Sequence, residues 1–138
     1  MLPRALLFAL PLALLAGLAE IRADDENPIV TLVKSKVQDK DKPLGMTVTF
    51  KVKAGEEKAF EEAFAPCVAA TRKEPGCVAY YLNRDVDEPS AFVVFEEYKN
   101  IVALEDHAKS PHVVELLKTV GPLIDGTPGV KVYSIAGE

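Results

Sequence analysis

Residues 46–53 alternate regularly between apolar and polar side chains. A period of two sustained over eight residues predicts a β-strand with one buried face and one solvent-facing face. Ala54 and Gly55 end the pattern. The predicted inner face consists of Met46, Val48, Phe50 and Val52, and the outer face of Thr47, Thr49, Lys51 and Lys53.

Residues 56–73 change to a helical period, with apolar side chains recurring every three or four positions. Glu56 and Glu57 suit the start of a helix, because negative charge stabilises the positive end of the helix dipole. Pro66 removes a backbone hydrogen bond, which predicts a kink, and residues 74–76 (Glu-Pro-Gly) end the helix. The apolar stripe consists of Phe60, Ala63, Phe64, Cys67 and Ala70.

Two further strands are predicted over residues 77–82 and 91–98. The segment between them, residues 83–90, is rich in turn-forming residues, so the two strands form a hairpin. The first strand places Val78, Tyr80 and Leu82 on one face. The second strand has apolar residues on both faces, which is typical of a central strand.

Asn100 is the predicted cap of a helix over residues 101–108, and Ser110 caps a second helix that begins at Pro111 and reaches Val120. A last strand follows at residues 130–135. The order strand, helix, strand, strand, split helix, strand predicts an α+β fold, a ferredoxin-like antiparallel sheet with helices on one face. Because the central strand is apolar on both sides, a second copy of the chain is the simplest cover for the other face.

Residues 1–23 have the layout of a secretory signal peptide, with a short basic start, an uncharged apolar run and small residues at the exit. Ala19 and Ala23 are the candidate cleavage points, and an uncleaved membrane anchor is the alternative. We therefore expect an exported protein, periplasmic or secreted. Residues 24–45 form an N-terminal extension with an edge strand at residues 29–33 and a charged loop at residues 34–43. Residues 46–138 form the main domain.

The chain is acidic, with a net charge of −5 over its 138 residues. This sign argues against a nucleic-acid partner, because such proteins concentrate positive charge. The two cysteines, Cys67 and Cys77, leave two alternatives open. Export would permit a disulfide between them, and two buried thiols are the other interpretation.

Residues 91–112 hold both histidines of the chain. Histidine is the side chain that titrates near neutral pH without perturbation, so general-base chemistry is sought here first. His107 is either a general base beside an apolar pocket or a surface or cap histidine. His112 lies five residues later, which does not place both rings on one helical face, so no metal site is expected.

The neighbouring polar and aromatic residues have two interpretations each. Tyr98 and Tyr80 either point a hydroxyl into a cavity or belong to the core. Glu96 and Glu97 are adjacent on a strand and point to opposite faces, so they do not form a paired-carboxylate site. One of the two can still be buried beside His107 and orient its ring.

Three segments resemble a known family: a strand that ends in KVKAG, a helix that reaches TRKEPGCVAYYL, and the block FVVFEEYKNIVALEDHAKSPHV. Together they resemble the antibiotic biosynthesis monooxygenase (ABM) domain of the dimeric α/β-barrel superfamily, over Met46 to Ile135. Members include cofactor-independent monooxygenases that act on quinols and anthrones. Other members degrade haem with an asparagine, a tryptophan and an axial histidine. The corresponding positions here are Val48, His107 and Leu117, and the chain has no tryptophan, so haem degradation is not expected.

The resemblance implies a homodimer that oxidises a small electron-rich aromatic with dioxygen, without cofactor or metal. His107 would be the base. Tyr98 and Tyr80 would orient the substrate ring, Phe50 and Phe95 would form the apolar wall, and His112 would complete the substrate-binding set. Two alternatives remain: a dimer that binds a small molecule without converting it, and a purely structural dimer whose pocket is filled by side chains.

Overall fold

Four antiparallel strands form one sheet in the order β2-β3-β1-β4. The structure is a computed structural model that describes residues 26–137. Its elements are α2 (Pro28–Lys36), β1 (Leu44–Lys51), α3 (Glu57–Thr71), β2 (Cys77–Arg84), β3 (Ala91–Tyr98), α4 (Ile101–Lys109), α5 (Pro111–Val120), the short 3-10 turn η1 (Gly121–Leu123) and β4 (Gly129–Ser134).

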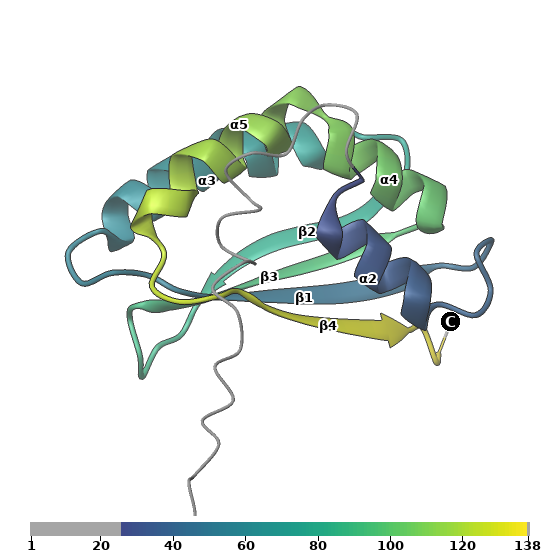
Figure 1. Ribbon diagram of the computed structural model, residues 1–138, viewed down its shortest axis with the longest axis horizontal. Coiled ribbons are helices and arrows are strands. Elements are labelled where there is room, and N and C mark those ends of the chain that lie inside the picture. The colour runs from purple at the N-terminus through teal and green to yellow at the C-terminus, as the bar shows by residue number, and fades with distance from the viewer. Residues whose placement is uncertain (1–25, 138) are drawn as a thin grey trace, which may run out of the picture.

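The helices α3, α4 and α5 cover one face of the sheet, as Figure 1 shows. The order of β1, α3, β2, β3, α4 with α5, and β4 confirms the predicted α+β, ferredoxin-like arrangement. β3 lies between β2 and β1, as expected of a strand that is apolar on both faces. Asn100 caps α4 as predicted, and its side chain accepts a hydrogen bond from the Ala103 amide at 2.9 Å.

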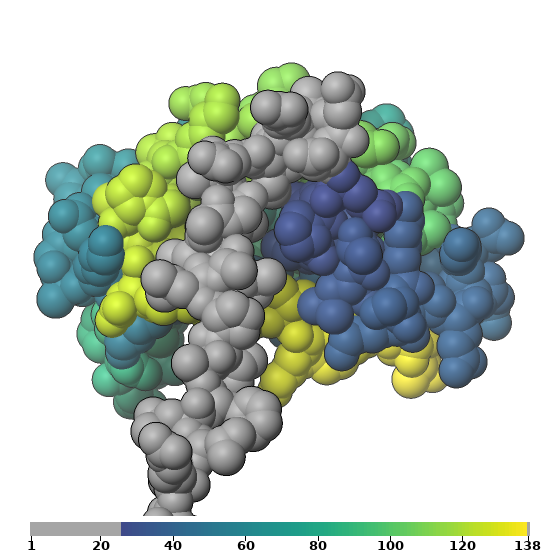
Figure 2. Space-filling view, in the orientation of Figure 1, coloured from purple at the N-terminus to yellow at the C-terminus, as the bar shows by residue number. Residues whose placement is uncertain are grey.

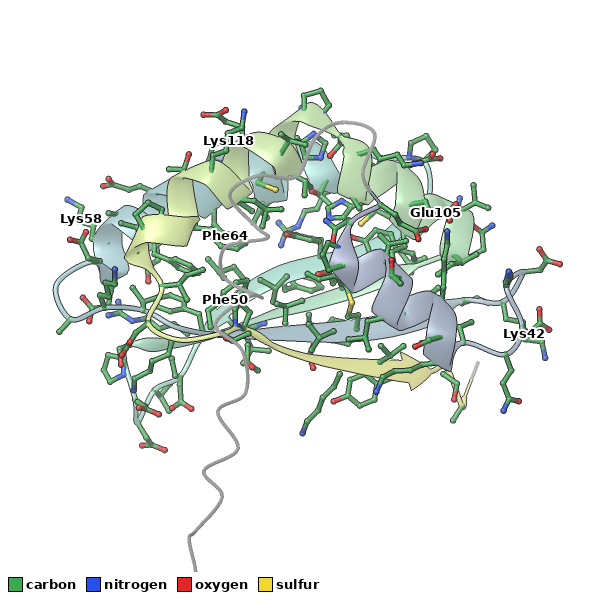
Figure 3. The ribbon with its side chains drawn as sticks, in the orientation of Figure 1. Lys42, Phe50, Lys58, Phe64, Glu105 and Lys118 are labelled. Atoms are coloured by element: carbon green, nitrogen blue, oxygen red, sulfur yellow. The ribbon has the colours of Figure 1, made fainter. Side chains whose placement is uncertain are left out.

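The core lies between the sheet and the helices and contains a cluster of four phenylalanines. The ring of Phe60 on α3 lies 5.4 Å from that of Phe50, 4.8 Å from that of Phe64 and 4.9 Å from that of Phe92, measured between centroids. Figure 3 shows Phe50 and Phe64 pointing toward one another between β1 and α3. This cluster joins two strands to the longest helix, which continues through Pro66.

The other face of the sheet carries no helix among residues 26–137. Large apolar side chains are exposed on this face. Tyr81, Phe95 and Thr47 lie side by side in the register of β2, β3 and β1 on this face. Tyr133 of β4 lies on the same face, opposite Gly45. Phe95 is 37% exposed and Tyr133 46% exposed, so the face is open to a partner.

The strand predicted at residues 29–33 is wrong, because this segment is part of the helix α2. The side chain of Asn27 accepts a hydrogen bond from the Ile29 amide, and Pro28 occupies the first turn. Val30 and Val33 are both buried, which is the three-residue spacing of a helix. An apolar run of only five residues fits both the period of a strand and the period of a helix, so it did not distinguish them.

α2 packs against α4 and β4, as Figures 1 and 2 show. Lys34 joins it to α4 through an ion pair with Glu105. The predicted loop over residues 34–43 therefore begins later, after Lys36. The predicted signal peptide, residues 1–23, lies outside the described residues. Among residues 26–137, no helix is long and apolar enough to cross a bilayer.

Two local expectations for β2 need correction. The register shifts between Cys77 and Ala79, and this irregularity leaves Val78 exposed rather than on the inner face with Tyr80. Both cysteines are free thiols, so the disulfide alternative is not realised. Cys67 is buried and within hydrogen-bonding distance of the Thr71 hydroxyl. Burial raises the pKa of the Cys67 thiol, which makes it an unreactive core residue.

Candidate functional site

His107 is buried in the last turn of α4, beneath the helix layer and against the sheet. The residue is 6% exposed, so of the two forms of the alternative, a surface or a cap histidine, the surface form does not hold. The imidazole packs between two tyrosine rings of the sheet, with centroids 5.5 Å from Tyr80 and 5.1 Å from Tyr98. Its two nitrogens face two different carboxyl groups, and this arrangement defines the site.

Glu74 meets the Nδ1 atom of His107. Both carboxyl oxygens lie 3.1 Å from this nitrogen. Burial alone would raise the pKa of the Glu74 carboxyl, but the hydrogen bonds and charges of His107 and His112 outweigh it and hold the pKa below its usual range. An ionised Glu74 accepts hydrogen bonds only, so Nδ1 must carry a proton. In the neutral imidazole the lone pair is then on Nε2.

Glu96 faces the Nε2 atom of His107 from β3, at 3.7 Å. The Glu96 side chain also accepts a hydrogen bond of 2.5 Å from the Tyr98 hydroxyl. Burial raises the pKa of the Glu96 carboxyl, and only part of this is offset by His107 and by the Tyr98 hydrogen bond. The prediction that one of the two adjacent glutamates is buried beside His107 is confirmed for Glu96, whereas Glu97 points to the open face.

His112, in the first turn of α5, approaches Glu74 from the solvent side. Its Nε2 atom lies 2.6 Å from Oε1 of Glu74 and 3.0 Å from the Ser110 hydroxyl. Ser110 donates its own hydroxyl proton to the carbonyl of His107 at 2.7 Å. The chain turns between α4 and α5 at Ser110, and this turn brings the two imidazole rings to 6.2 Å between centroids.

The cluster of Glu74, His107 and His112 could therefore hold a metal ion, since one ligand atom from each residue lies within 4.8 Å of the others. Helical spacing alone does not predict this arrangement. The two histidines stand on different helices, so the five-residue separation does not decide whether they meet. Glu74 was missed because nothing in its spacing connects it with residues about thirty positions later.

A small, largely apolar cavity of about 60 Å³ lies on the inner side of His107. Of the predicted site residues, His107, Tyr80 and Phe50 line it, together with Glu96. Tyr98 does not point its hydroxyl into the cavity, because that hydroxyl is bound to Glu96. His112 lines a groove on the outer surface with Glu74 and Ser110 instead.

Phe95 is not part of the cavity wall. It lies on the open face of the sheet, because successive side chains of a strand point to opposite faces and its neighbour Val94 points inward. The wall is formed instead by residues of all layers, including Met46 and Val48 of β1 and Leu104 of α4. Val30 of α2 also lines the cavity.

Gly76 allows the turn that carries Glu74 to pack closely against α4. A Cβ atom at this position would lie 2.2 Å from the Cβ of Ala103 and 3.2 Å from its Cα. We expect Gly76→Ala to lower the free energy of unfolding by about 1–3 kcal/mol, because backbone or helix must shift to relieve the clash. Urea denaturation measures the effect.

Gly121→Ala is the matched control for this substitution. Gly121 has a helical backbone conformation, and nothing lies within 4 Å of its added Cβ. It should be neutral or stabilising by about 0.4–1 kcal/mol. Equal losses in the two variants would show that close packing at Gly76 is unimportant.

The raised pKa of Glu96 predicts a pH-dependent effect of Glu96→Gln. The folded state keeps the Glu96 proton to a higher pH than the unfolded chain does. The stability from this group is therefore complete below the unfolded pKa and declines as pH rises toward the folded pKa. Glutamine cannot ionise and escapes this decline.

We expect the unfolding free energy of Glu96→Gln, relative to the unsubstituted protein, to increase with pH above about 4.5, by at most about 1.4 kcal/mol per pH unit. Urea titrations between about pH 5 and about pH 8 measure this difference. A difference that stays constant over the range would contradict a raised pKa.

The sequence profile of the family described as "Antibiotic biosynthesis monooxygenase" matches residues 43–119, more than half of the chain. The chain belongs to this family. The match covers β1 to α5 and all residues of the Glu74, His107 and His112 cluster, whereas α2 precedes it and β4 follows it.

Two relatives are each 29% identical to this chain over the aligned residues. One is sll1783 of Synechocystis, an uncharacterised protein aligned over 100 residues, which are 72% of this chain and 68% of the relative. The other is Rv0793 of Mycobacterium tuberculosis, whose name proposes a monooxygenase, aligned over 92 residues, which are 67% of this chain and 90% of the relative.

Solved structures have the same fold. The structure of Rv0793 superimposes with a TM-score of 0.65 at 28% identity and covers 70% of this chain and 97% of its own. A structure from Caulobacter crescentus gives a TM-score of 0.65 at 27% identity and covers 71% of this chain and 93% of its own. A structure from Nitrosomonas europaea gives a TM-score of 0.68 at 22% identity and covers 72% of this chain and 96% of its own. At this identity the likeness shows the fold alone.

Proposed function

We propose that this ABM protein is an exported, cofactor-independent monooxygenase that oxidises a small electron-rich aromatic of the quinol or anthrone type with dioxygen. The observation that carries the proposal is the orientation of His107. Glu74 holds its Nδ1–H, so the basic Nε2 atom lies at the cavity wall beside Glu96. Membership of the ABM family supports the same reaction class.

The first step would be removal of a phenolic or activated C–H proton from the substrate by Nε2 of His107. The ionised Glu74 on the opposite nitrogen stabilises the imidazolium that forms, since opposite charges attract at 3.1 Å. Glu74 in turn is bound by His112, whose Nε2 atom also lies 3.0 Å from the Ser110 hydroxyl at the outer groove. This chain of hydrogen bonds offers the proton a route from the cavity to solvent.

The second step would be transfer of electrons from the substrate anion to dioxygen. For an anthrone, the reacting carbon loses two hydrogen atoms and gains one oxygen atom, and the second oxygen atom leaves as water with those two hydrogens. The apolar walls from Phe50, Val48 and Leu104 favour this chemistry, because they keep bulk water from the intermediate.

Substrate entry requires the cavity to expand. At about 60 Å³ it is smaller than the roughly 150 Å³ apolar cavity that binds benzene in another protein. We propose that α2 is the element that moves, because Val30 lines the cavity and α2 precedes the family match. The ion pair of Lys34 with Glu105 joins α2 to α4.

Val30→Ala should therefore widen the cavity. It should raise kcat/KM for an accepted aromatic by on the order of tenfold, because a change of one or two methyl groups in an apolar pocket alters kcat/KM by about this factor. It should also lower the unfolding free energy by about 1–3 kcal/mol. Leu32→Ala is the control on the same helix, because Leu32 points outward and is not part of the cavity wall. Equal kcat/KM in both variants would contradict a role for α2 in admission.

We also propose that the open sheet face forms a homodimer. Tyr81, Phe95 and Tyr133 present apolar area there, and a second copy of the same face is self-complementary under twofold symmetry. Sedimentation of the purified protein tests this part of the proposal. A monomer at micromolar concentration would contradict it.

Oxygen uptake tests the proposed activity. The purified protein, treated with chelator, is offered a panel of hydroquinones and anthrones, with a phenyl ether of similar size as the control that has no acidic hydroxyl. Enzyme-dependent uptake with hydroquinones or anthrones, and none with the phenyl ether, supports the proposal. Tight binding of a panel member without uptake would replace it with the second candidate function, a small-molecule carrier of the same fold.

A further inference from the structure

We propose that Glu74, His107 and His112 bind one divalent transition-metal cation of the Zn²⁺ type at the boundary between the cavity and the outer groove. The ligand atoms are a carboxylate oxygen of Glu74, Nδ1 of His107 and Nε2 of His112, all within 4.8 Å of one another. Two imidazoles and one carboxylate are a ligand set that such cations take in proteins, with further positions left for water.

Two of the three ligand-to-ligand distances are close to those of a coordination sphere. The carboxylate oxygens lie 3.1 Å from Nδ1 of His107 and 2.6 Å from Nε2 of His112. Bonds of about 2.0–2.2 Å to such a metal place neighbouring ligand atoms about 3.0–3.4 Å apart. The Glu74 oxygen would move slightly away from Nε2 of His112, and the two imidazole nitrogens, which lie within 4.8 Å of each other, would adopt the same spacing around the ion.

A metal site also needs groups that hold its ligands in place, and the surroundings of His107 supply one. A ligating histidine generally donates its other N–H to a carboxyl or carbonyl group, which fixes the ring. For His107 this group is Glu96, 3.7 Å from Nε2, and Glu96 is itself held by the Tyr98 hydroxyl. Glu96 is 4% exposed, so its position is determined by the core rather than by solvent.

The cation has a route to the site. Glu74, Ser110 and His112 line the outer groove of about 380 Å³, whose wall also includes Asp106. His107 lines the inner cavity. An ion entering from the groove thus meets Glu74 and His112 first and His107 last.

The bound ion would change the state of His107, and this consequence rests on the proposed function. Without metal, Nδ1 carries the proton and Nε2 is free to act as a base. With metal on Nδ1, the proton of the neutral ring moves to Nε2, which then donates toward Glu96. His107 cannot accept a substrate proton in that form, so the cation would act as an inhibitor and not as a cofactor.

Calorimetric titration of the chelator-treated protein with Zn²⁺, in the absence of any substrate, tests the site. We expect one ion per chain, and titration with Co²⁺ should give the visible absorption bands of nitrogen and oxygen ligation. His112→Ala and Glu74→Gln should each weaken Zn²⁺ binding by more than about 100-fold. Glu96→Gln should weaken it by about 10–100-fold, the usual effect of changing the group behind a metal-bound histidine.

Two controls distinguish the site from other ligands. Cys77→Ser removes the half-buried thiol and should leave the affinity unchanged, as should Glu88→Gln at a distant exposed position. Absence of binding, or binding that survives His112→Ala together with Glu74→Gln, would overturn the proposal. Because the readout contains no substrate, its outcome is independent of the oxygen-uptake assay.

Discussion

Replacement of His107 by alanine is expected to lower turnover of an accepted aromatic by about 10²–10⁴-fold, the usual contribution of a positioned general base. The expectation follows from the contacts of the imidazole, whose Nδ1 is held by Glu74 at 3.1 Å and whose Nε2 lies at the cavity wall. Alanine leaves the cavity apolar, so substrate should still bind. The measurement is steady-state oxygen uptake, with the dissociation constant determined separately under nitrogen.

Val102→Ala is the control on the same helix. Val102 is exposed on α4 and does not line the cavity, so both turnover and binding should stay unchanged. A His107→Ala variant that keeps its turnover would exclude His107 as the base. Loss of binding along with turnover would instead indicate that the ring positions the substrate.

Phe60→Ala is expected to produce the largest loss of stability, about 3–5 kcal/mol in the free energy of unfolding. Phe60 is fully buried, and its ring contacts those of Phe50, Phe64 and Phe92. Its removal leaves a void in the layer that joins α3 to the sheet, and rigid neighbours on two strands limit collapse into the space. Since a domain of this size has a total stability of about 5–15 kcal/mol, the variant should be close to the limit of folding.

Phe60→Leu separates loss of volume from loss of the aromatic contacts. Leucine refills most of the space, so it should recover more than half of the stability lost in the alanine variant. Urea denaturation followed by far-ultraviolet circular dichroism measures both. A loss below about 1 kcal/mol for Phe60→Ala would show that the four rings are not a rigid unit.

The sequence predicts the fold well because its patterns are local and mutually consistent. The alternation of Met46 to Lys53, the stripe from Phe60 to Ala70 and the capping of α4 by Asn100 each identify an element within two residues or so of its observed ends. Residues 29–33 were assigned the wrong element, because five apolar residues fit either period. The decisive signal was the Asn27-Pro28 start of a helix, which preceded the apolar run.

The site was predicted only in part, because its contacts are long-range. His107 and the burial of Glu96 follow from position along helix and strand. Glu74 lies in the turn between α3 and β2, and it joins the site only because α4 and α5 carry its partners, 33 and 38 residues away, to that turn. The burial of Tyr98 fixed its hydroxyl on Glu96 rather than in the cavity, and strand alternation placed Phe95 on the opposite face.

The interior position of β1 in the sheet has a consequence for how the chain folds. β1 pairs with β3 on one side and with β4 on the other, so that Leu44 lies opposite both Tyr98 and Ser134. Because a ribosome delivers the chain from its N-terminus, β1 emerges before either neighbour. One of its edges stays unpaired until residues 129–134 have been synthesised, and an unpaired edge of a strand recruits other chains. A nascent chain that stalls before β4 is thus an aggregation hazard. Pairing with β4 covers the free edge of β1 and prevents other chains from pairing with it.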